Sequence, residues 1–212
     1  MERKKIRFWF LWLSLICVIA FVLQNIVNGF TDMFILNLSA LYGFQIWRFV
    51  TAIFLHGGIV HLIYNLFALL LFGFILERII GSRNFLIVFF LSGIIGNLVS
   101  VNFYPSSLGA SGAIYGVIGC VAILEPMMMV WAFGLLMPMF VAAILWIAGG
   151  VLGMLGMFND NTGYVAHLSG IVIGIISGIV FRIIYTRKKK KLEEKMIIPD
   201  DYVGEWEERF VK

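Results

Sequence analysis

The segment GASGAIYGVIGCVAILE, residues 109–125, begins with small residues and continues as an apolar run. Gly112 and Gly116 are four positions apart, so on a helix they form a stripe of small side chains on one face. Such stripes let the backbones of two helices come close together, which is typical of packing inside a membrane. Ser111 adjoins this stripe. The segment therefore predicts a membrane helix that packs closely against a second helix and carries a serine at the contact.

A matching stripe lies in the last apolar segment, where Gly170, Gly174 and Gly178 recur every four positions. His167 precedes the first of them by three positions, so a helix presents it on the same face. Pressing the two stripes together brings His167 next to Ser111. A serine beside a histidine provides the two essential parts of base-activated nucleophilic catalysis.

The composition is that of a membrane protein. Of the 212 residues, 61% are hydrophobic and 13% are charged, with a mean hydropathy of +0.98. This balance excludes an ordinary soluble globular domain. Most of the net charge of +4 comes from basic residues near the two ends, within residues 3–7 and 182–191. That placement suits membrane topology better than nucleic-acid binding, so the lipid bilayer is the expected partner and no nucleic acid is expected.

A spanning helix needs about 20 mainly apolar residues, and six segments of the sequence qualify. They cover residues 8–28, 59–77, 84–103, 109–125, 130–152 and 164–185. Since basic segments stay in the cytoplasm, both termini are predicted to be cytoplasmic, which an even number of crossings satisfies. We predict an all-α, multi-pass protein of the cell membrane. Its six-helix transmembrane domain would cover residues 1–187 and a short charged cytoplasmic tail residues 188–212.

The first loop, residues 29–58, is long and unusually apolar, so we expect it to lie partly in the membrane interface. Arg48 falls on the outer side of the membrane, against the usual bias of basic residues. We expect its guanidinium to bind carbonyl groups of this loop while Trp47 anchors the loop at the interface. His56 is expected to pin the loop by hydrogen bonds rather than to act in catalysis.

Polar residues of the apolar segments gather in one layer near the outer membrane surface. His61 and Asn65 lie near the outer end of the second segment, Ser111 near that of the fourth and His167 near that of the sixth. Because polar groups are costly in hydrocarbon, such a layer indicates function. His61, Asn65 and the Ser111 backbone N–H are candidate donors to the oxyanion that forms when a peptide carbonyl is attacked.

The histidine of this layer has no expected carboxylate partner. Glu77 and Glu125 fall at the inner ends of their segments and Asp160 falls in a loop, so serine and histidine would form a dyad. Tyr115, one turn further along the serine helix, is placed to stack its ring on His167 and to hold the imidazole.

An ordered set of motifs runs from residue 47 to residue 174. It consists of Trp47-Arg48-x-x-Thr51, His56, His61-x-x-x-Asn65, Glu77-Arg78 with Gly81-Ser82, Gly109-Ala110-Ser111-Gly112 with Tyr115, and Ala166-His167-x-x-Gly170-x-x-x-Gly174. In these residues the sequence closely resembles the rhomboid family of intramembrane serine proteases, in its basic six-helix form.

The resemblance implies a serine endopeptidase that hydrolyses peptide bonds in or near the transmembrane segments of membrane proteins through an acyl-enzyme. It implies Ser111 as nucleophile, His167 as base, His61 and Asn65 in the oxyanion hole, and Tyr115 packed on the histidine. No cofactor or metal is implied, and the oligomeric state is left open.

Parts of this pattern also fit other interpretations. Ser111 could serve only as a small residue in a helix contact, and Asn65 could form a purely structural hydrogen bond between helices. His61 and His167 could bind zinc, although no HExxH motif or acidic pair accompanies them. A non-catalytic rhomboid relative that binds membrane clients would usually lack the serine or the histidine. A small transporter would place its polar residues at mid-membrane rather than near one face.

The segment 130–152 is expected to form a helix that moves sideways to admit substrate. Pro138 is expected to kink it, and the methionines of residues 127–139 suit adaptable packing. The loop over residues 156–163 would lift as a cap. The bulky residues expected to form this gate are Phe133, Met137, Met139 and Trp146.

Overall fold

The computed structural model describes residues 6–158, 160, 162–196 and 209. The chain forms two compact units, Met1–Ile179 and Val180–Lys212, and the candidate site lies in the first. The last helix, α10 (Tyr164–Met196), begins in the first unit and ends in the second. Much of the predicted tail and part of the first basic cluster lie outside the described residues. The predicted domain boundary at residue 187 therefore stays a prediction.

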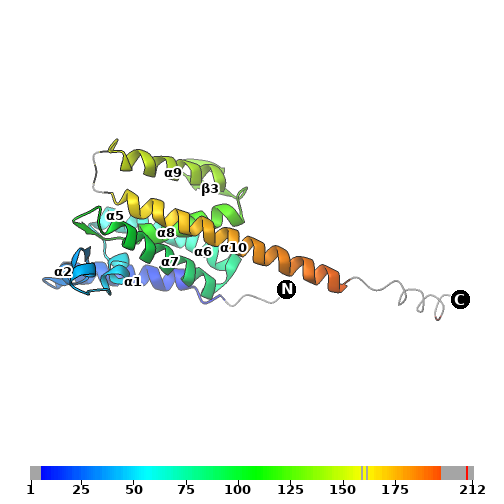
Figure 1. The fold of residues 1–212 in the computed structure, drawn as a ribbon, viewed down its shortest axis with the longest axis horizontal. Coiled ribbons are helices and arrows are strands. Elements are labelled where there is room, and N and C mark those ends of the chain that lie inside the picture. The colour runs from blue at the N-terminus through cyan, green and yellow to red at the C-terminus, as the bar shows by residue number, and fades with distance from the viewer. Residues whose placement is uncertain (1–5, 159, 161, 197–208, 210–212) are drawn as a thin grey trace. The chain divides into compact units, whose positions relative to one another are not determined.

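Four helices of the described chain are long and apolar enough to cross a membrane. They are α1 (Trp9–Ile26), the continuous helix Ile59–Ile80, α7 (Ser82–Ser100) and the Tyr164–Arg187 part of α10. The second of these consists of α5 (Ile59–Ala68), the π-helical turn η2 (Leu69–Gly73) and α6 (Phe74–Ile80). Two shorter apolar helices are α8 (Ser111–Leu124) and α9 (Met139–Met154). Each predicted segment thus contains helix (Figure 1), while the count of six crossings stays a prediction.

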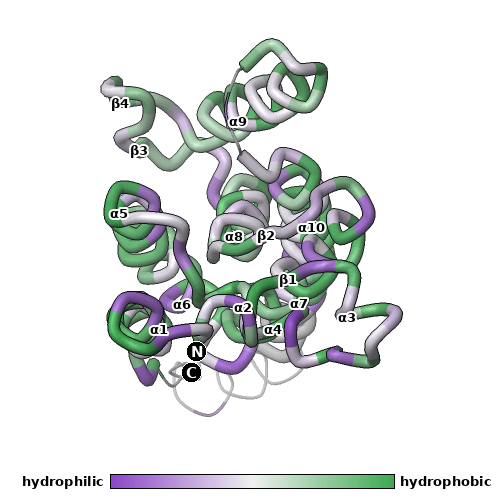
Figure 2. Tube along the Cα trace, turned by 90° about the vertical axis from the view of Figure 1, so that its left-hand side faces the viewer, coloured by the Kyte–Doolittle hydropathy of each residue, from purple (hydrophilic) through white to green (hydrophobic). Residues whose placement is uncertain are grey.

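Helix α8 lies in the middle of the surrounding helices (Figure 2), and most of its side chains are buried. It begins shortly after Gly109, whose φ of +124° favours glycine, and it ends before Pro126, which cannot continue a helix. Helix α7 packs alongside, so closely that a Cβ added to Gly93 would lie 3.0 Å from the Cβ of Ala113. Because protein surrounds α8, the thickness of the hydrocarbon does not set its length.

The two glycine stripes meet and hold α8 against α10. A Cβ added to Gly170 would collide with the carbonyl oxygen of Gly112, and one added to Gly174 would collide with that of Gly116. Backbone atoms of one helix therefore fill the space that side chains would take on the other. The close contact predicted from the glycine spacing is confirmed.

The predicted helix over residues 130–152 is wrong in its first part. Strand β3 (Met129–Ala132) and strand β4 (Leu135–Pro138) form an antiparallel hairpin there, and α9 begins only at Met139. Phe133 and Gly134 have φ of 55° and 78°, the positive values that a two-residue hairpin turn requires. Pro138 occupies the N-cap of α9 and does not kink it, since proline without an N–H is well tolerated at a helix start.

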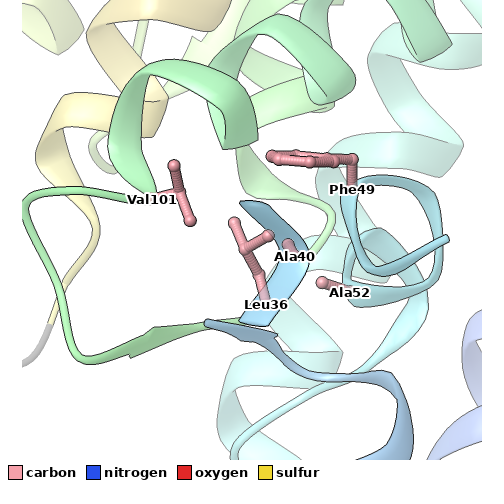
Figure 3. Packing of buried hydrophobic residues seen from close by; sticks show 5 residues of the cluster. All are labelled: Leu36, Ala40, Phe49, Ala52 and Val101. Atoms are coloured by element: carbon pink, nitrogen blue, oxygen red, sulfur yellow. The ribbon is translucent and has the colours of Figure 1, made fainter. Parts of the chain in front are cut away.

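The first loop folds into short elements over the end of α7. They are α2 (Phe30–Phe34), β1 (Leu36–Asn37), α3 (Ser39–Tyr42), α4 (Arg48–Thr51) and the 3-10 helix η1 (Ala52–Phe54). Strand β1 pairs antiparallel with β2 (Ser106–Ser107), which follows α7. A buried apolar cluster joins these parts (Figure 3), and its members are Leu36, Ala40, Phe49, Ala52 and Val101.

Arg48 is buried inside this loop. Its Nη1 donates hydrogen bonds to the carbonyl oxygens of Asp32, at 2.7 Å, and Ile35, at 2.6 Å. Trp47 is exposed, and its indole N–H donates to the carbonyl oxygen of Met33 at 3.3 Å. The guanidinium thus binds loop carbonyls, as its placement in the sequence suggested, while the depth of the loop in the membrane stays a prediction.

Candidate active site

Ser111 and His167 are in direct hydrogen-bond contact. Ser111 is the first residue of α8, and His167 lies in the first turn of α10. The distance from Ser111 Oγ to His167 Nε2 is 2.6 Å, and the histidine is buried. The packing of glycine against backbone brings the two helix starts this close, because a Cβ added to Gly170, three residues after His167, would collide with the carbonyl oxygen of Gly112, the residue next to Ser111.

The other ring nitrogen of His167, Nδ1, is buried without a hydrogen-bond partner in the part of the chain that the structure describes. The nearby carboxylate of Asp160 accepts a hydrogen bond from the Tyr164 hydroxyl at 2.7 Å. This bond, and a weaker one from the backbone of Thr162, lower the pKa of Asp160. Ser111 and His167 thus form a pair, and no carboxylate among the described residues binds the histidine.

Two aromatic rings hold the imidazole of His167. The ring of Tyr115 stacks on it with centroids 4.3 Å apart and planes inclined by 11°. Tyr164 meets it edge-on at 6.2 Å. With one ring on its face and one at its edge, the imidazole has little freedom to rotate away from Ser111. Sequence reasoning missed Tyr164, although a tyrosine three positions before His167 lies on the same helical face.

His61, on α5, borders the space next to Ser111 and Gly109. A Cβ added to Gly109 would lie 2.9 Å from His61 Nε2 and 3.8 Å from Ser111 Oγ. On the opposite side of the ring, the backbone N–H of Gly57 donates to His61 Nδ1 at 3.4 Å. Since Nδ1 accepts this bond, the neutral ring carries its proton on Nε2, the nitrogen that faces Gly109.

Asn65 lies one turn after His61 and is buried. Its Nδ2 donates to the backbone carbonyl of His61 at 2.8 Å, a bond within its own helix. An amide nitrogen has two hydrogens, so one N–H is available for a second acceptor. The structure therefore brings His61 to the serine and gives Asn65 a helical bond, and the oxyanion role of both stays a prediction.

His56 supports this cluster from behind. Its ring meets His61 edge-on at 5.2 Å, and its Nδ1 lies 3.2 Å from the carbonyl oxygen of Phe54. Burial, and then the nearby His61, lower the pKa of His56 to about 4, so the ring is neutral at ordinary pH.

Sequence reasoning missed the residue that fixes the backbone of His56. Gln24, near the end of α1, accepts from the His56 N–H at 2.9 Å and donates to its carbonyl oxygen at 3.2 Å. It also donates to the Thr31 hydroxyl at 3.2 Å. The available signal was a polar side chain inside an apolar segment, which requires a partner in a membrane.

Comparisons with known proteins agree with this architecture. A family profile for the Rhomboid domain matches residues 43–183. The chain is 36% identical over 121 residues to "Rhomboid-like protease 3" of Toxoplasma gondii, covering 52% of this chain and 46% of that protein. It is 29% identical over 176 residues to "Rhomboid protease GlpG" of Haemophilus influenzae, covering 79% and 88%.

A third relative, "Rhomboid protein 1, mitochondrial" of Saccharomyces cerevisiae, is 32% identical over 155 residues, or 66% of this chain and 43% of that protein. The chain thus spans about half the length or less of several curated relatives that it matches. The profile match covers well over half of this sequence, and the apolar helices are those of a multi-pass membrane protein. The chain belongs to the rhomboid family.

Proposed function

We propose that this chain is an intramembrane serine endopeptidase whose nucleophile is Ser111 and whose general base is His167. The observation that carries the proposal is the 2.6 Å separation of Ser111 Oγ and His167 Nε2, which is short enough for proton transfer. Three similar proteins are named as rhomboid or rhomboid-like proteases, and these names support proteolysis as the activity.

The reaction proceeds through an acyl-enzyme. Ser111 Oγ attacks the carbonyl carbon of the scissile peptide bond while its proton passes to His167 Nε2. The tetrahedral intermediate then breaks its C–N bond, and His167 gives the proton to the leaving amine. A water molecule, deprotonated by the same nitrogen, hydrolyses the ester and frees the serine. The stack with Tyr115 supports this sequence, because both proton transfers need the imidazole in one orientation.

Three donors are proposed to stabilise the oxyanion: His61 Nε2–H, the second Nδ2–H of Asn65 and the backbone N–H of Ser111. The Gly57 bond to Nδ1 supports the donor state of His61. The Ser111 N–H belongs to the start of α8, where amide groups have no carbonyl partner within the helix.

Transmembrane proteins are the proposed substrates, and they enter past α9. Trp146 on α9 meets Phe72 of η2 edge-on at 5.6 Å, so these rings lie where the two helices would separate. Of the other residues expected in this gate, Phe133 and Met137 belong to the hairpin, and Met139 is a buried residue at the start of α9. Part of the proposed cap, residues 159 and 161, lies outside the described residues.

We place the protein in the cell membrane with six crossings and both termini in the cytoplasm. The four long helices support a multi-pass topology, and the basic residues near both ends support the orientation. Large exposed apolar side chains in the first loop, among them Phe44 and Ile46, support its partial insertion in the interface.

A fluorophosphonate probe tests the proposal, because it labels only an activated serine. The wild-type protein in proteoliposomes should be labelled and should cleave a model transmembrane substrate. Ser111→Ala should lose both properties, and His167→Ala should lose nearly all turnover. Ser177→Ala is the matched control, since its hydroxyl bonds a carbonyl of its own helix, and it should behave as wild type. A wild-type protein that binds the substrate without labelling or cleavage would instead be a non-catalytic, client-binding relative.

A further inference from the structure

The hairpin β3–β4 exposes apolar side chains on a face where a solvated sheet would carry polar ones. Met129 and Trp131 point outward while Val130 and Ala132 are buried. In the observed register Trp131 pairs with Leu136, so Leu136 lies on the outward face with Trp131. These outward side chains are 52%, 61% and 58% exposed, for Met129, Trp131 and Leu136 in turn. Antiparallel sheets that face water alternate apolar and polar residues, and this one does not.

The surrounding sequence indicates what covers this face. Residues 126–159 contain no Asp, Glu, Lys, Arg or His. The outward side chains named above offer one hydrogen-bonding group, the indole N–H of Trp131. Protein interfaces carry about one hydrogen bond per 100–200 Å², so a protein partner would find little to bind. A tryptophan among aliphatic residues is typical of the boundary between lipid headgroups and acyl chains.

The hairpin also cannot lie far from the membrane, because apolar helices adjoin both of its ends. Strand β3 begins five residues after the last residue of α8, Leu124, and β4 runs directly into α9. The first N–H groups of α9 complete the connection: Met139 N–H donates to the Met128 carbonyl at 2.9 Å, and Phe140 N–H donates to the Pro126 carbonyl at 3.0 Å. The segment that leads into β3 is therefore hydrogen-bonded to the start of α9.

We propose that the hairpin β3–β4 is seated in the lipid headgroup boundary and anchors α9 there. Short strands suit this depth, because the unpaired backbone groups at their edges can reach water or headgroups, as they cannot in the hydrocarbon. The occupant of the outward face is thus bilayer lipid rather than a second copy of the chain or a soluble protein.

The turn of the hairpin contacts α9, the helix past which substrate is proposed to enter. The ring of Phe133 packs against Trp146 at 5.3 Å, and Trp146 in turn meets Phe72 at 5.6 Å. Phe133 has a φ of 55°, a conformation that costs energy for a bulky residue and that asparagine or glycine adopts more easily. A seated hairpin therefore holds α9 against η2, and this step rests on the proposed function.

A nitroxide attached to Leu136→Cys reports whether the hairpin lies in lipid or in water, and this measurement does not depend on enzyme activity. Its electron paramagnetic resonance signal in proteoliposomes should respond more to oxygen, which concentrates in lipid, than to a water-soluble nickel chelate. Arg83→Cys, at an exposed position in the first turn of α7, is the water-facing control and should respond mainly to nickel. The unsubstituted protein gives the background, since Cys17 and Cys120 are buried. A nickel-dominated signal at Leu136→Cys would overturn the proposal, as would low response to both reagents together with cross-linking between copies.

Two variants then distinguish the position of the hairpin in lipid from its effect on α9. Leu136→Lys should raise the hairpin out of the lipid, increase turnover of a transmembrane substrate severalfold and lower the melting temperature, while Leu136→Ala leaves both near wild type. Phe133→Asn suits the turn but removes the ring, so it should raise turnover with an unchanged nitroxide signal. Fluorophosphonate labelling should be unaltered in all three. If turnover is unaffected by both Leu136→Lys and Phe133→Asn although the oxygen response is found, the anchor does not restrain α9. If the wild type has no activity, the proposed function fails while the seat is still measured.

Discussion

Gly109→Ala should damage the site through His61 rather than through Ser111 itself. The added Cβ would lie 2.8 Å from His61 Cε1, whereas ordinary van der Waals contact begins at 3.4 Å, so the ring must retreat by 3.4 − 2.8 = 0.6 Å or more. The φ of +124° adds backbone strain of about 1–3 kcal/mol. Because a misplacement of about 1 Å costs on the order of 10²-fold in rate, we expect turnover to fall between about 10-fold and 10²-fold.

The assay is the initial rate of cleavage of a fluorogenic transmembrane substrate in proteoliposomes, well below the melting temperature of each variant. Gly57→Ala is the matched control on the other side of the same ring. Its added Cβ would lie 3.9 Å from His61 Nδ1 and 3.7 Å from Leu108 Cδ1, which are ordinary contacts. The control should retain wild-type turnover, and KM should change little in Gly109→Ala. Equal turnover in the two folded variants would refute the argument that the space beside Gly109 positions His61.

Three further outcomes are expected. Asn65→Ala should lower turnover by at most about 10²-fold to 10³-fold, because two other donors stay in place; an unchanged rate would make Asn65 structural. Trp146→Ala should raise turnover of a transmembrane substrate and lower the melting temperature, since it removes the ring contact with Phe72; slower cleavage would argue against entry past α9. The stability of the protein should fall as the pH drops from about 6.5 to about 4, because the unfolded chain then protonates His56 while the folded chain, with its pKa lowered to about 4, does not. The free energy of unfolding should decrease by on the order of 3 kcal/mol over this range. His56→Gln should therefore make the melting temperature less dependent on pH between these values. An equally steep dependence in the variant would assign the effect to other groups.

The sequence was sufficient where periodicity decides the structure. Glycines four positions apart on two segments define which helix faces meet, so the contact of α8 with α10 and the approach of His167 to Ser111 follow from spacing alone. The bonds of Arg48 follow from a second physical rule, because a buried guanidinium must find acceptors and the loop carbonyls are the nearest ones.

The hydrophobic pattern does not predict secondary structure where the same residues suit a helix and a strand equally well. The run Met129–Pro138 is apolar throughout, and such a run does not distinguish a helix from a strand. The turn that decides the matter contains Phe133 in a conformation that phenylalanine rarely adopts, so no local preference marks it. Gln24 was missed for a different reason: its partner His56 is 32 positions away, and only the folded chain brings them together.

The backbone contact between α8 and α10 makes the effects of mutation unequal in the two directions. At Gly112, Gly116, Gly170 and Gly174 there is no side chain to remove, so an alanine scan that interprets truncation has nothing to truncate there. An added methyl group at Gly116, Gly170 or Gly174 would collide with atoms already in place, whereas at Gly112 it would make only ordinary contacts. Substitutions that truncate side chains and measure the loss of stability would thus not detect the interface that aligns Ser111 with His167. It would appear only in a scan that enlarges residues one methyl group at a time.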